Sequence, residues 1–298
     1  MVYVKNDIVR KTFLFILVCV EVMIMLTSCK NGGNDFVEPP HEQNSEVVEN
    51  ADYTKKDSVI RLVSYNVGIF SKYKDSITMI AAMMNELQAD AVCLNELDSC
   101  TTRTGKVNQS KLLAQRMGDW HHFFAGAMPY KGGAYGEGMV VSPKFRNEGT
   151  YALKIPQGSG AEPRVCAVFK TEKFVFLATH LDHVNESARI DGADRICKWA
   201  KDNYGDSDIP VFLCGDMNCE PNDAPLLRLK EDWELLSVTK NTYPIGPAKY
   251  PSKCIDFILA LKNKAQYEVV GSDVPMSFKT GSIREASDHL PIYVDVIL

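Results

Sequence analysis

The sequence lacks the short motifs that would assign several common chemistries. It contains no CxxC pair, no HExxH motif and no Cys/His cluster at zinc spacing, which argues against a zinc site. The glycine-rich stretch 131–138 is not followed by the Lys-Ser/Thr of a phosphate-binding P-loop. Basic residues are not in excess either. The whole chain has a net charge of −5. Residues 1–28 hold three basic and two acidic side chains, a net charge of +1, so residues 29–298 carry −6. This acidic balance lowers the expectation for a non-specific binder of duplex DNA.

A basic start and an apolar run mark the N-terminus. Three basic residues precede an apolar stretch, residues 12–27, that is shorter than the roughly 20 residues a membrane span needs. The stretch leads into Leu-Thr-Ser-Cys29, which resembles the cleavage and lipidation box of bacterial lipoproteins. We therefore expect residues 1–28 to be a signal peptide and Cys29 to be lipidated. The protein would then be exported and anchored to a bacterial membrane, in the periplasm or at the cell surface. A plain signal anchor is the alternative.

The rest of the chain divides into a short polar segment and one long segment of ordinary globular composition. Residues 29–57 are polar, acidic and poor in large apolar side chains, which predicts a flexible tether. Residues 58–298 are long enough for one large α/β domain. Seven of the nine cysteines fall there, an odd number with no paired spacing. We expect them to be small buried hydrophobic residues rather than a complete disulfide framework.

Short β-branched runs alternate with helical stretches along residues 58–298. Apolar residues at three- and four-residue spacing predict helices over 75–88, 109–117 and 187–203. Apolar runs predict strands over 59–65, 90–95, 138–142, 164–170, 174–180, 209–215, 254–260 and 291–297. The pattern indicates a single α/β domain with two packed sheets inside and helices outside.

Polar side chains recur at the ends of six of these predicted strands. They are carboxylates, amides and imidazoles: Asn66, Glu96, His180, Asp216, Asn218, Asp256, Asp288 and His289. Because strand ends on one rim of a sheet converge, we expect these groups to form one site. Glu96 and Asp288 offer hard oxygen ligands, which suit Mg²⁺ or Mn²⁺. The remaining carboxylates and histidines can move protons, which is the inventory of a metal-assisted phosphoester hydrolysis.

Six sequence blocks resemble the ordered signature of the endonuclease/exonuclease/phosphatase superfamily, which includes deoxyribonuclease I. They are SYNV (64–67), NE (95–96), THL (179–181), GDMN (215–218), IDF (255–257) and SDHLP (287–291). Two softer blocks agree, YGEGMVVS (135–142) and EPR (162–164). The resemblance implies a four-layer α/β sandwich in which two packed mixed β-sheets are flanked by helices. The chain departs from many relatives at Glu137, where an Asn is common, and at Lys253-Cys254, where an Arg often stands.

The resemblance also implies a metal site. Glu96 would be the principal ligand of a Mg²⁺ ion (Mn²⁺ being possible), with Asn66 beside it on metal or phosphate. Asp288 would complete the metal shell. Asp216 would orient or deprotonate the attacking water, and Asn218 would bind a phosphoryl oxygen.

The same resemblance implies roles for two histidines and for the residues around them. His289, paired with Asp256, would stabilise charge at the scissile phosphate, because a carboxylate favours the protonated form of its histidine. His180 would face the same phosphate, oriented by Glu162 in relatives that keep that pair. Arg164 would bind phosphate through its fork of donors, and the loop at 131–138 would place Tyr135 near it. Which histidine protonates the leaving oxygen stays open.

Several alternatives remain at this level. A phosphodiesterase is the leading interpretation, with a small phosphodiester, a phospholipid or a nucleic acid as substrate. The other readings are an extracytoplasmic nuclease, a phospholipase C-like or phosphomonoesterase specificity, and a non-catalytic binder of phosphate ligands on the same fold. No obligate protein partner is evident. Asp182 and His183 would line the mouth of the site or form a surface turn, Arg189 is close enough in sequence to reach a substrate, and residues 120–124 read as a half-buried strand.

Overall fold

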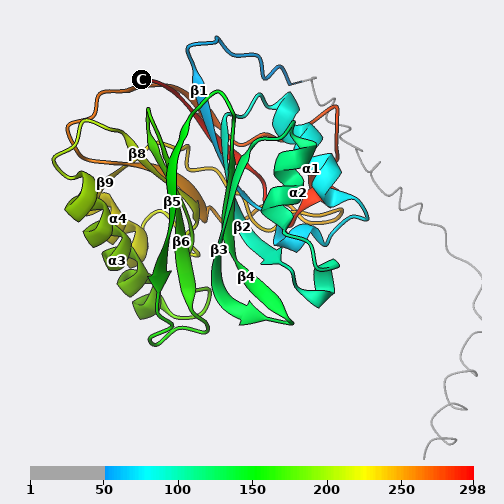
Figure 1. The fold of residues 1–298 in the computed structure, drawn as a ribbon, viewed down its shortest axis with the longest axis horizontal. Helices are drawn as coiled ribbons and strands as arrows, with labels where there is room; N and C mark the ends of the chain where they lie inside the picture. The colour runs from blue at the N-terminus through cyan, green and yellow to red at the C-terminus, as the bar shows by residue number, and fades with distance from the viewer. Residues whose placement is uncertain (1–50) are drawn as a thin grey trace, which may run out of the picture. The chain divides into compact units, whose positions relative to one another are not determined.

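A computed structural model describes residues 51–298, which form two six-stranded mixed sheets packed face to face (Figure 1). The first sheet has the strand order β11-β12-β1-β2-β4-β3 and the second β5-β6-β7-β8-β10-β9. Helices α1 and α2 lie outside the first sheet, and α3 and α4 lie outside the second (Figure 1). The expected four-layer sandwich of two packed mixed sheets flanked by helices is thus confirmed.

The first sheet joins strands from the beginning and the end of the described part, and the second is built from the six consecutive strands between them. The first contains β1 (Ile60–Asn66), β2 (Ala91–Ser99), β3 (His121–Tyr130), β4 (Gly133–Val141), β11 (Glu268–Asp273) and β12 (Ile292–Ile297). The second contains β5 (Asn147–Ile155), β6 (Arg164–Thr171), β7 (Val175–His180), β8 (Val211–Asp216), β9 (Trp233–Leu235) and β10 (Asp256–Leu261). The central pairs β1–β2 and β7–β8 are parallel, and the other pairs are antiparallel.

Two of the helices, α2 and α3, begin at a capping asparagine side chain. Asn108 accepts a hydrogen bond from Lys111 N at the start of α2 (Gln109–Arg116), and Asn185 accepts one from Ala188 N at the start of α3. Such caps satisfy amide groups that have no partner within the helix. The other helices are α1 (Ser76–Glu86), α3 (Glu186–Tyr204), α4 (Ala224–Asp232), α5 (Ile283–Ala286) and the short 3-10 turns η1 (Gly68–Phe70) and η2 (Thr102–Thr104).

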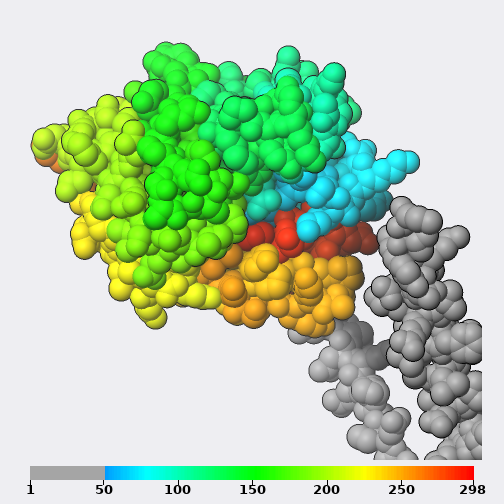
Figure 2. Space-filling model, turned by 90° about the horizontal axis from the view of Figure 1, so that it is seen from below, coloured from blue at the N-terminus to red at the C-terminus, as the bar shows by residue number. Residues whose placement is uncertain are grey.

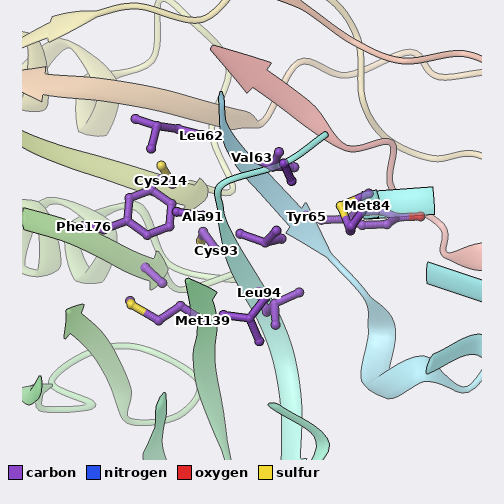
Figure 3. Close-up of a cluster of buried hydrophobic side chains, with 14 of the residues drawn as sticks. Leu62, Val63, Tyr65, Met84, Ala91, Cys93, Leu94, Met139, Phe176 and Cys214 are labelled. Carbon is purple, nitrogen blue, oxygen red and sulfur yellow. The ribbon is translucent and has the colours of Figure 1, made fainter. Parts of the chain in front are cut away.

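The main core fills the space between the two sheets. Leu62 and Cys93 of the first sheet belong to the same buried cluster as Phe176 and Cys214 of the second (Figure 3). Strand residues alternate between faces, so Leu177, next to Phe176, belongs instead to a second buried cluster with α3 and α4. The seven cysteines of the described part are unpaired, and all but Cys100 are buried, as expected for small hydrophobic residues.

The eight predicted strands and three predicted helices are all present, and the stretch 120–124 leads into β3. Strands β5, β9 and β11 and helices α4 and α5 were not predicted. The predicted signal peptide, Cys29 and most of the tether lie outside the described residues. Tertiary contacts begin before residue 58, because the hydroxyl of Tyr53 donates to Ser277 O (2.7 Å) and Lys55 pairs with Asp90 (2.9 Å). Within residues 51–298, no helix has the length and apolarity to cross a membrane.

Candidate active site

The ends of the two central parallel strand pairs meet at one end of the sandwich. In the first sheet Asn66 lies opposite Asn95 across β1 and β2; in the second, Asp216 lies opposite His180 of β7 and Asp256 of β10. Segments that are far apart in the sequence, coloured cyan, red and orange, lie on one face of the molecule (Figure 2). A cavity of 520 Å³ lies at the strand ends, and its lining includes Tyr243, Lys253 and Asp288 from loops late in the chain.

Most of the predicted site residues line this one cavity. Those on its surface are Glu96, Tyr135, Glu162, Arg164, His180, Asp216, Asn218, Asp288 and His289. Asn66 and Asp256 lie directly behind it, each hydrogen-bonded to one of the lining residues. The structure therefore brings together every site residue that the sequence nominated within residues 51–298.

Two asparagines connect the sheets at this point. The side chain of Asn95, on β2, accepts a hydrogen bond from Asp216 N (3.0 Å) and donates one to Thr179 O (2.8 Å), both in the second sheet. The Asn66 amide donates to Glu96 Oε1 (3.1 Å) and to Asp216 Oδ2 (3.2 Å). Each asparagine thus fixes a carboxylate of the site relative to the opposite sheet.

Glu96 reaches the cavity through an irregularity in its strand. The pairing of β2 with β4 shifts register between Leu94 and Leu97, and Glu96 has a φ of 58°. A bulge leaves one residue unpaired and re-aims its side chain, and a positive φ is uncommon for a residue other than glycine. Such outliers persist where surrounding structure holds them, often at functional sites.

Asp216 is the centre of the site. Its Oδ2 atom lies 3.5 Å from His180 Nε2 and 3.6 Å from His289 Nε2, while Oδ1 accepts a hydrogen bond from Asn218 N (2.9 Å). Burial, reinforced by the negative charge of Asp256, raises the pKa of Asp216 to about 7. A carboxyl group with such a pKa can exchange a proton near neutral pH.

His289 is held by Asp256. Its Nδ1 lies 2.9 Å from Asp256 Oδ2, and the Thr242 hydroxyl donates to the same oxygen (2.6 Å). The ring of Tyr243 lies against the imidazole, with 4.6 Å between centroids. Burial alone would lower the pKa of His289, but the charge and hydrogen bond of Asp256 outweigh it and raise the pKa to about 9.

His180 has the opposite environment. Its nearest carboxylate at Nδ1 is Glu137 Oε1, 3.9 Å away. Burial, and secondly the charge of Arg164, lower the pKa of His180 well below its usual value. Burial raises the pKa of Glu137 to about 8, although Asn95 Nδ2 donates to its other oxygen (2.8 Å). The two histidines around Asp216 thus differ: His289 is cationic at neutral pH and His180 is neutral.

Arg164 is a buried guanidinium with free donors. Only 4% of it is exposed, and its Nη2 lies 2.9 Å from His183 Nδ1 and 3.3 Å from Glu162 Oε1. Its Nε and Nη1 atoms are buried and have no partner in the described structure. Since buried donors are normally satisfied, and Arg164 lines the cavity, the geometry fits an anion bound at this place.

The sequence and fold now place the chain among known proteins. The model of the Endonuclease/Exonuclease/phosphatase family matches residues 63–289. The chain belongs to this family. No curated protein matches the sequence significantly.

Solved structures share the fold of this family at low sequence identity. The mannosyl-6-phosphatase of Bacteroides thetaiotaomicron VPI-5482 matches with 17% identity and a TM-score of 0.67, over 80% of this chain and 100% of its own. The human Nocturnin catalytic domain with bound sulfate matches with 18% identity and a TM-score of 0.61, over 80% and 93% of the two chains. TDP2 of D. rerio, in complex with a single-strand DNA product, matches with 17% identity and a TM-score of 0.61, over 80% of this chain and 99% of its own.

One family role inferred from the sequence differs from the geometry. Glu162 was expected to orient His180, but it forms an ion pair with Arg164, and the carboxylate beside His180 Nδ1 is Glu137. Glu137 was noted only as a departure from the Asn common in the Endonuclease/Exonuclease/phosphatase family. Its buried position next to His180 depends on which face of β4 turns inward, and the alternation of YGEGMVV around it could have signalled that.

For three more residues near the cavity, His183, Arg189 and Asp182, the sequence left open whether they belong to the site or to the surface. His183 contacts Arg164, and Arg189 donates to Asp182 O (3.0 Å); both line the cavity. The carboxylate of Asp182 is buried and accepts hydrogen bonds from the backbone amides of Ala161, Val184 and Asn185 at 2.7–2.9 Å. Asp182 therefore ties the loop that carries Glu162 to the start of α3.

The donor set fits a hard divalent cation, which is usual in the Endonuclease/Exonuclease/phosphatase family. Glu96 and Asp288 both line the cavity, and Asp288 is paired only with the partly exposed Lys72 (3.2 Å). Ligand atoms of Asp216, Asp256 and His289 also lie within 4.8 Å of one another. His289 Nδ1 is hydrogen-bonded to Asp256, whereas the carboxylates at the cavity surface present oxygen atoms, as Mg²⁺ and Mn²⁺ prefer.

Proposed function

We propose that the chain hydrolyses phosphoesters, with Mg²⁺ as its ion and a phosphodiester as its main substrate. The observation that carries this proposal is the buried Arg164, which lines the same cavity as Asp216 and His289 and has two donors without a partner in the described structure. The guanidinium of Arg164 supplies hydrogen-bond donors for the phosphate. Asp216 supplies a proton acceptor and His289 a proton donor. Glu96, Asp288 and Asn66 would hold the ion, which supplies charge neutralisation at the phosphoryl group.

The protonation states define the proton path. Asp216, with a pKa of about 7, accepts the proton of the attacking water. The water oxygen bonds to phosphorus as the bond to the leaving oxygen breaks. His289, with a pKa of about 9, is the cationic histidine and donates its proton to that leaving oxygen. His180 stays neutral beside the phosphate, and Asn218 and Arg164 hold its oxygens.

A phosphomonoesterase is the second candidate, favoured by the basic side of the cavity. Arg189, Lys253 and Arg164 line it together, and a monoester carries the larger negative charge. The solved relative named as a mannosyl-6-phosphatase is in keeping with this possibility. A bis-ester and a monoester with the same leaving group would distinguish the two.

The test is a hydrolysis panel with Mg²⁺, Mn²⁺ or EDTA. It contains bis(nitrophenyl) phosphate, nitrophenyl phosphate, sphingomyelin and plasmid DNA. We expect metal-dependent turnover that is lost in His289→Ala and kept in the surface variant Tyr250→Ala. Metal-loaded, folded protein that turns over none of these esters, yet binds phosphate, would instead support a non-catalytic binding protein.

We also propose that the protein is exported and held at a bacterial membrane through Cys29. The support is the Leu-Thr-Ser-Cys29 box after the basic and apolar N-terminus. Expression in a bacterium fed a labelled fatty acid should label the wild type and leave Cys29→Ala unlabelled and released from membranes. A Cys29→Ala variant that keeps its label would refute lipidation at this residue.

A further inference from the structure

Lys72 forms an ion pair with one of the proposed metal ligands. Its Nζ atom lies 3.2 Å from Asp288 Oδ2. Among the described residues, no other lysine or arginine lies within ion-pair distance of Asp288 or Glu96, and Glu96 accepts a hydrogen bond from the uncharged Asn66 amide (3.1 Å). Asp288 lines the cavity and Lys72 does not, so the ammonium group approaches this carboxylate from outside the cavity.

The turn η1, which leads to Lys72, has an unusual backbone that the fold holds in place. Gly68, Ile69 and Phe70 all have positive φ angles, of 51°, 51° and 53°. For a β-branched residue such as Ile69 this conformation is rare and strained, and it persists only where surrounding structure holds it. Here Gln109, which is 2% exposed, donates from Nε2 to Ile69 O (2.7 Å). The backbone position of Lys72, two residues beyond the turn, is therefore set by tertiary contacts.

The same turn lies against the ion pair. A Cβ atom at Gly68 would be 3.4 Å from Asp288 Oδ1 and 3.8 Å from Lys72 Cε. The Gly68 amide donates to Asn66 Oδ1 (3.1 Å), and Ser287 Oγ donates to Asn66 O (2.6 Å). One short turn thus connects Lys72 to two of the three proposed metal ligands, Asp288 and Asn66.

The pair between Lys72 and Asp288 is of a kind that breaks easily. The two side chains are 43% and 37% exposed, and such pairs are weak because water competes for both partners and salt screens them. A carboxylate can exchange this partner for a divalent cation, which carries twice the charge and binds oxygen directly. An ammonium group beside that carboxylate also repels the cation. Both effects weaken cation binding relative to a site without Lys72.

We infer that Lys72 competes with the divalent cation for Asp288 and thereby lowers the affinity of the metal site. This inference rests on the proposed function, because it takes Asp288 as a ligand of the cation. Lys72 neutralises and orients Asp288 until the cation replaces it. It is therefore a positioning residue that sets the concentration of cation at which the site fills.

The test is a calorimetric titration of the full chain with Mn²⁺, in the wild type and in Lys72→Met. This substitution removes the charge and keeps an unbranched side chain. We expect Lys72→Met to bind Mn²⁺ about three- to tenfold more tightly, the size of one exposed ion pair with one nearby like charge. Lys72→Arg, which keeps the charge, should bind Mn²⁺ within about twofold of the wild type. The matched control is Lys74→Met, an exposed lysine two residues away, which should change the Kd by less than about twofold.

The outcomes separate the competition from the metal assignment itself. An unchanged Kd in Lys72→Met, or equal tightening in Lys72→Met and Lys74→Met, would overturn the competition for Asp288 and leave the metal site in place. Absence of Mn²⁺ binding by both the wild type and Lys72→Met would overturn the competition together with the metal ligands of the proposed function. The readout is an affinity, so it does not depend on which phosphoester the protein hydrolyses.

Discussion

Nδ1 of His180 and Oε1 of Glu137 face each other at 3.9 Å, and neither atom has a hydrogen-bond partner in the described structure. Burial raises the pKa of Glu137 to about 8 and lowers that of His180. Both groups are therefore neutral at pH 7, a carboxylic acid beside an imidazole.

The first prediction concerns stability and pH. Because folding raises the pKa of Glu137 from 4.5 to about 8, the folded state holds a proton that the unfolded chain has released. The stability due to that proton is complete below pH 4.5 and is lost as pH rises to about 8. The free energy of unfolding in urea should therefore fall more steeply from pH 5 to pH 8 in the wild type than in Glu137→Gln.

The control for this experiment is Glu268→Gln, since Glu268 is an exposed residue of β11. It should follow the wild type at every pH. Using the difference between variants removes the opposite contribution of His180, whose lowered pKa costs stability as pH falls. Parallel curves for wild type and Glu137→Gln would show that Glu137 is ionised in the folded protein.

The second prediction concerns Arg164. Arg164→Lys keeps the charge but removes the planar fork that presents two free donors. We expect kcat/KM for a phosphoester to fall about 10- to 100-fold, the cost of losing hydrogen bonds to a charged group. Calorimetry with inorganic phosphate should show the same loss. The matched control is Arg195→Lys, on the outer part of α3; an effect as large there would mean that the loss is not specific to the cavity.

The third prediction concerns the upper limb of the pH–rate profile. Asp256 is the main group that raises the pKa of His289 to about 9. Activity that depends on cationic His289 should therefore decline above about pH 9. In Asp256→Asn the decline should move to lower pH. An upper limb that stays in place in this variant would remove His289 as the proton donor.

The fourth prediction concerns a buried ion pair between β1 and β12. Arg61 of β1 donates from Nε and Nη2 to the two carboxylate oxygens of Asp295 of β12, each at 2.7 Å, and from Nη1 to Tyr53 O (2.8 Å). Asp295→Ala leaves a buried guanidinium uncompensated and should lower the free energy of unfolding by about 3–5 kcal/mol. Asp202→Ala, which breaks the exposed pair with Lys198, should change it by less than about 1 kcal/mol.

The sequence predicted the strands near the site better than those at the edges, for physical reasons. Central strands such as β7 and β8 are buried on both faces and read as continuous apolar runs. Edge strand β5 alternates polar and apolar residues with several exposed positions, and β11 is mostly exposed, so neither shows a clear apolar run. The sequence also predicted that the polar residues of the site lie close together, because the ends of neighbouring strands meet at one edge of a sheet.

The sequence predicted which residues form the site better than it predicted which of them contact one another. That Glu162 meets Arg164 depends on the loop 157–162, which Asp182 holds from 21 residues away. That Glu137 meets His180 depends on the packing of β4 in one sheet on β7 in the other. The strand pattern around Glu137 indicates which face it occupies, but not that His180 is its neighbour, because that contact is set by tertiary packing.

The side chain of Asn95 makes the geometry of the site depend on the packing of the two sheets. Its side chain connects a strand of one sheet to backbone groups of two strands of the other, directly behind Asp216. The groups of the proposed active site come from both sheets, and their alignment exists only while the sheets are docked. If the two sheets separated, we expect activity to be lost even while the helices and strands persist. Loss of turnover would therefore detect separation of the sheets before any loss of secondary structure.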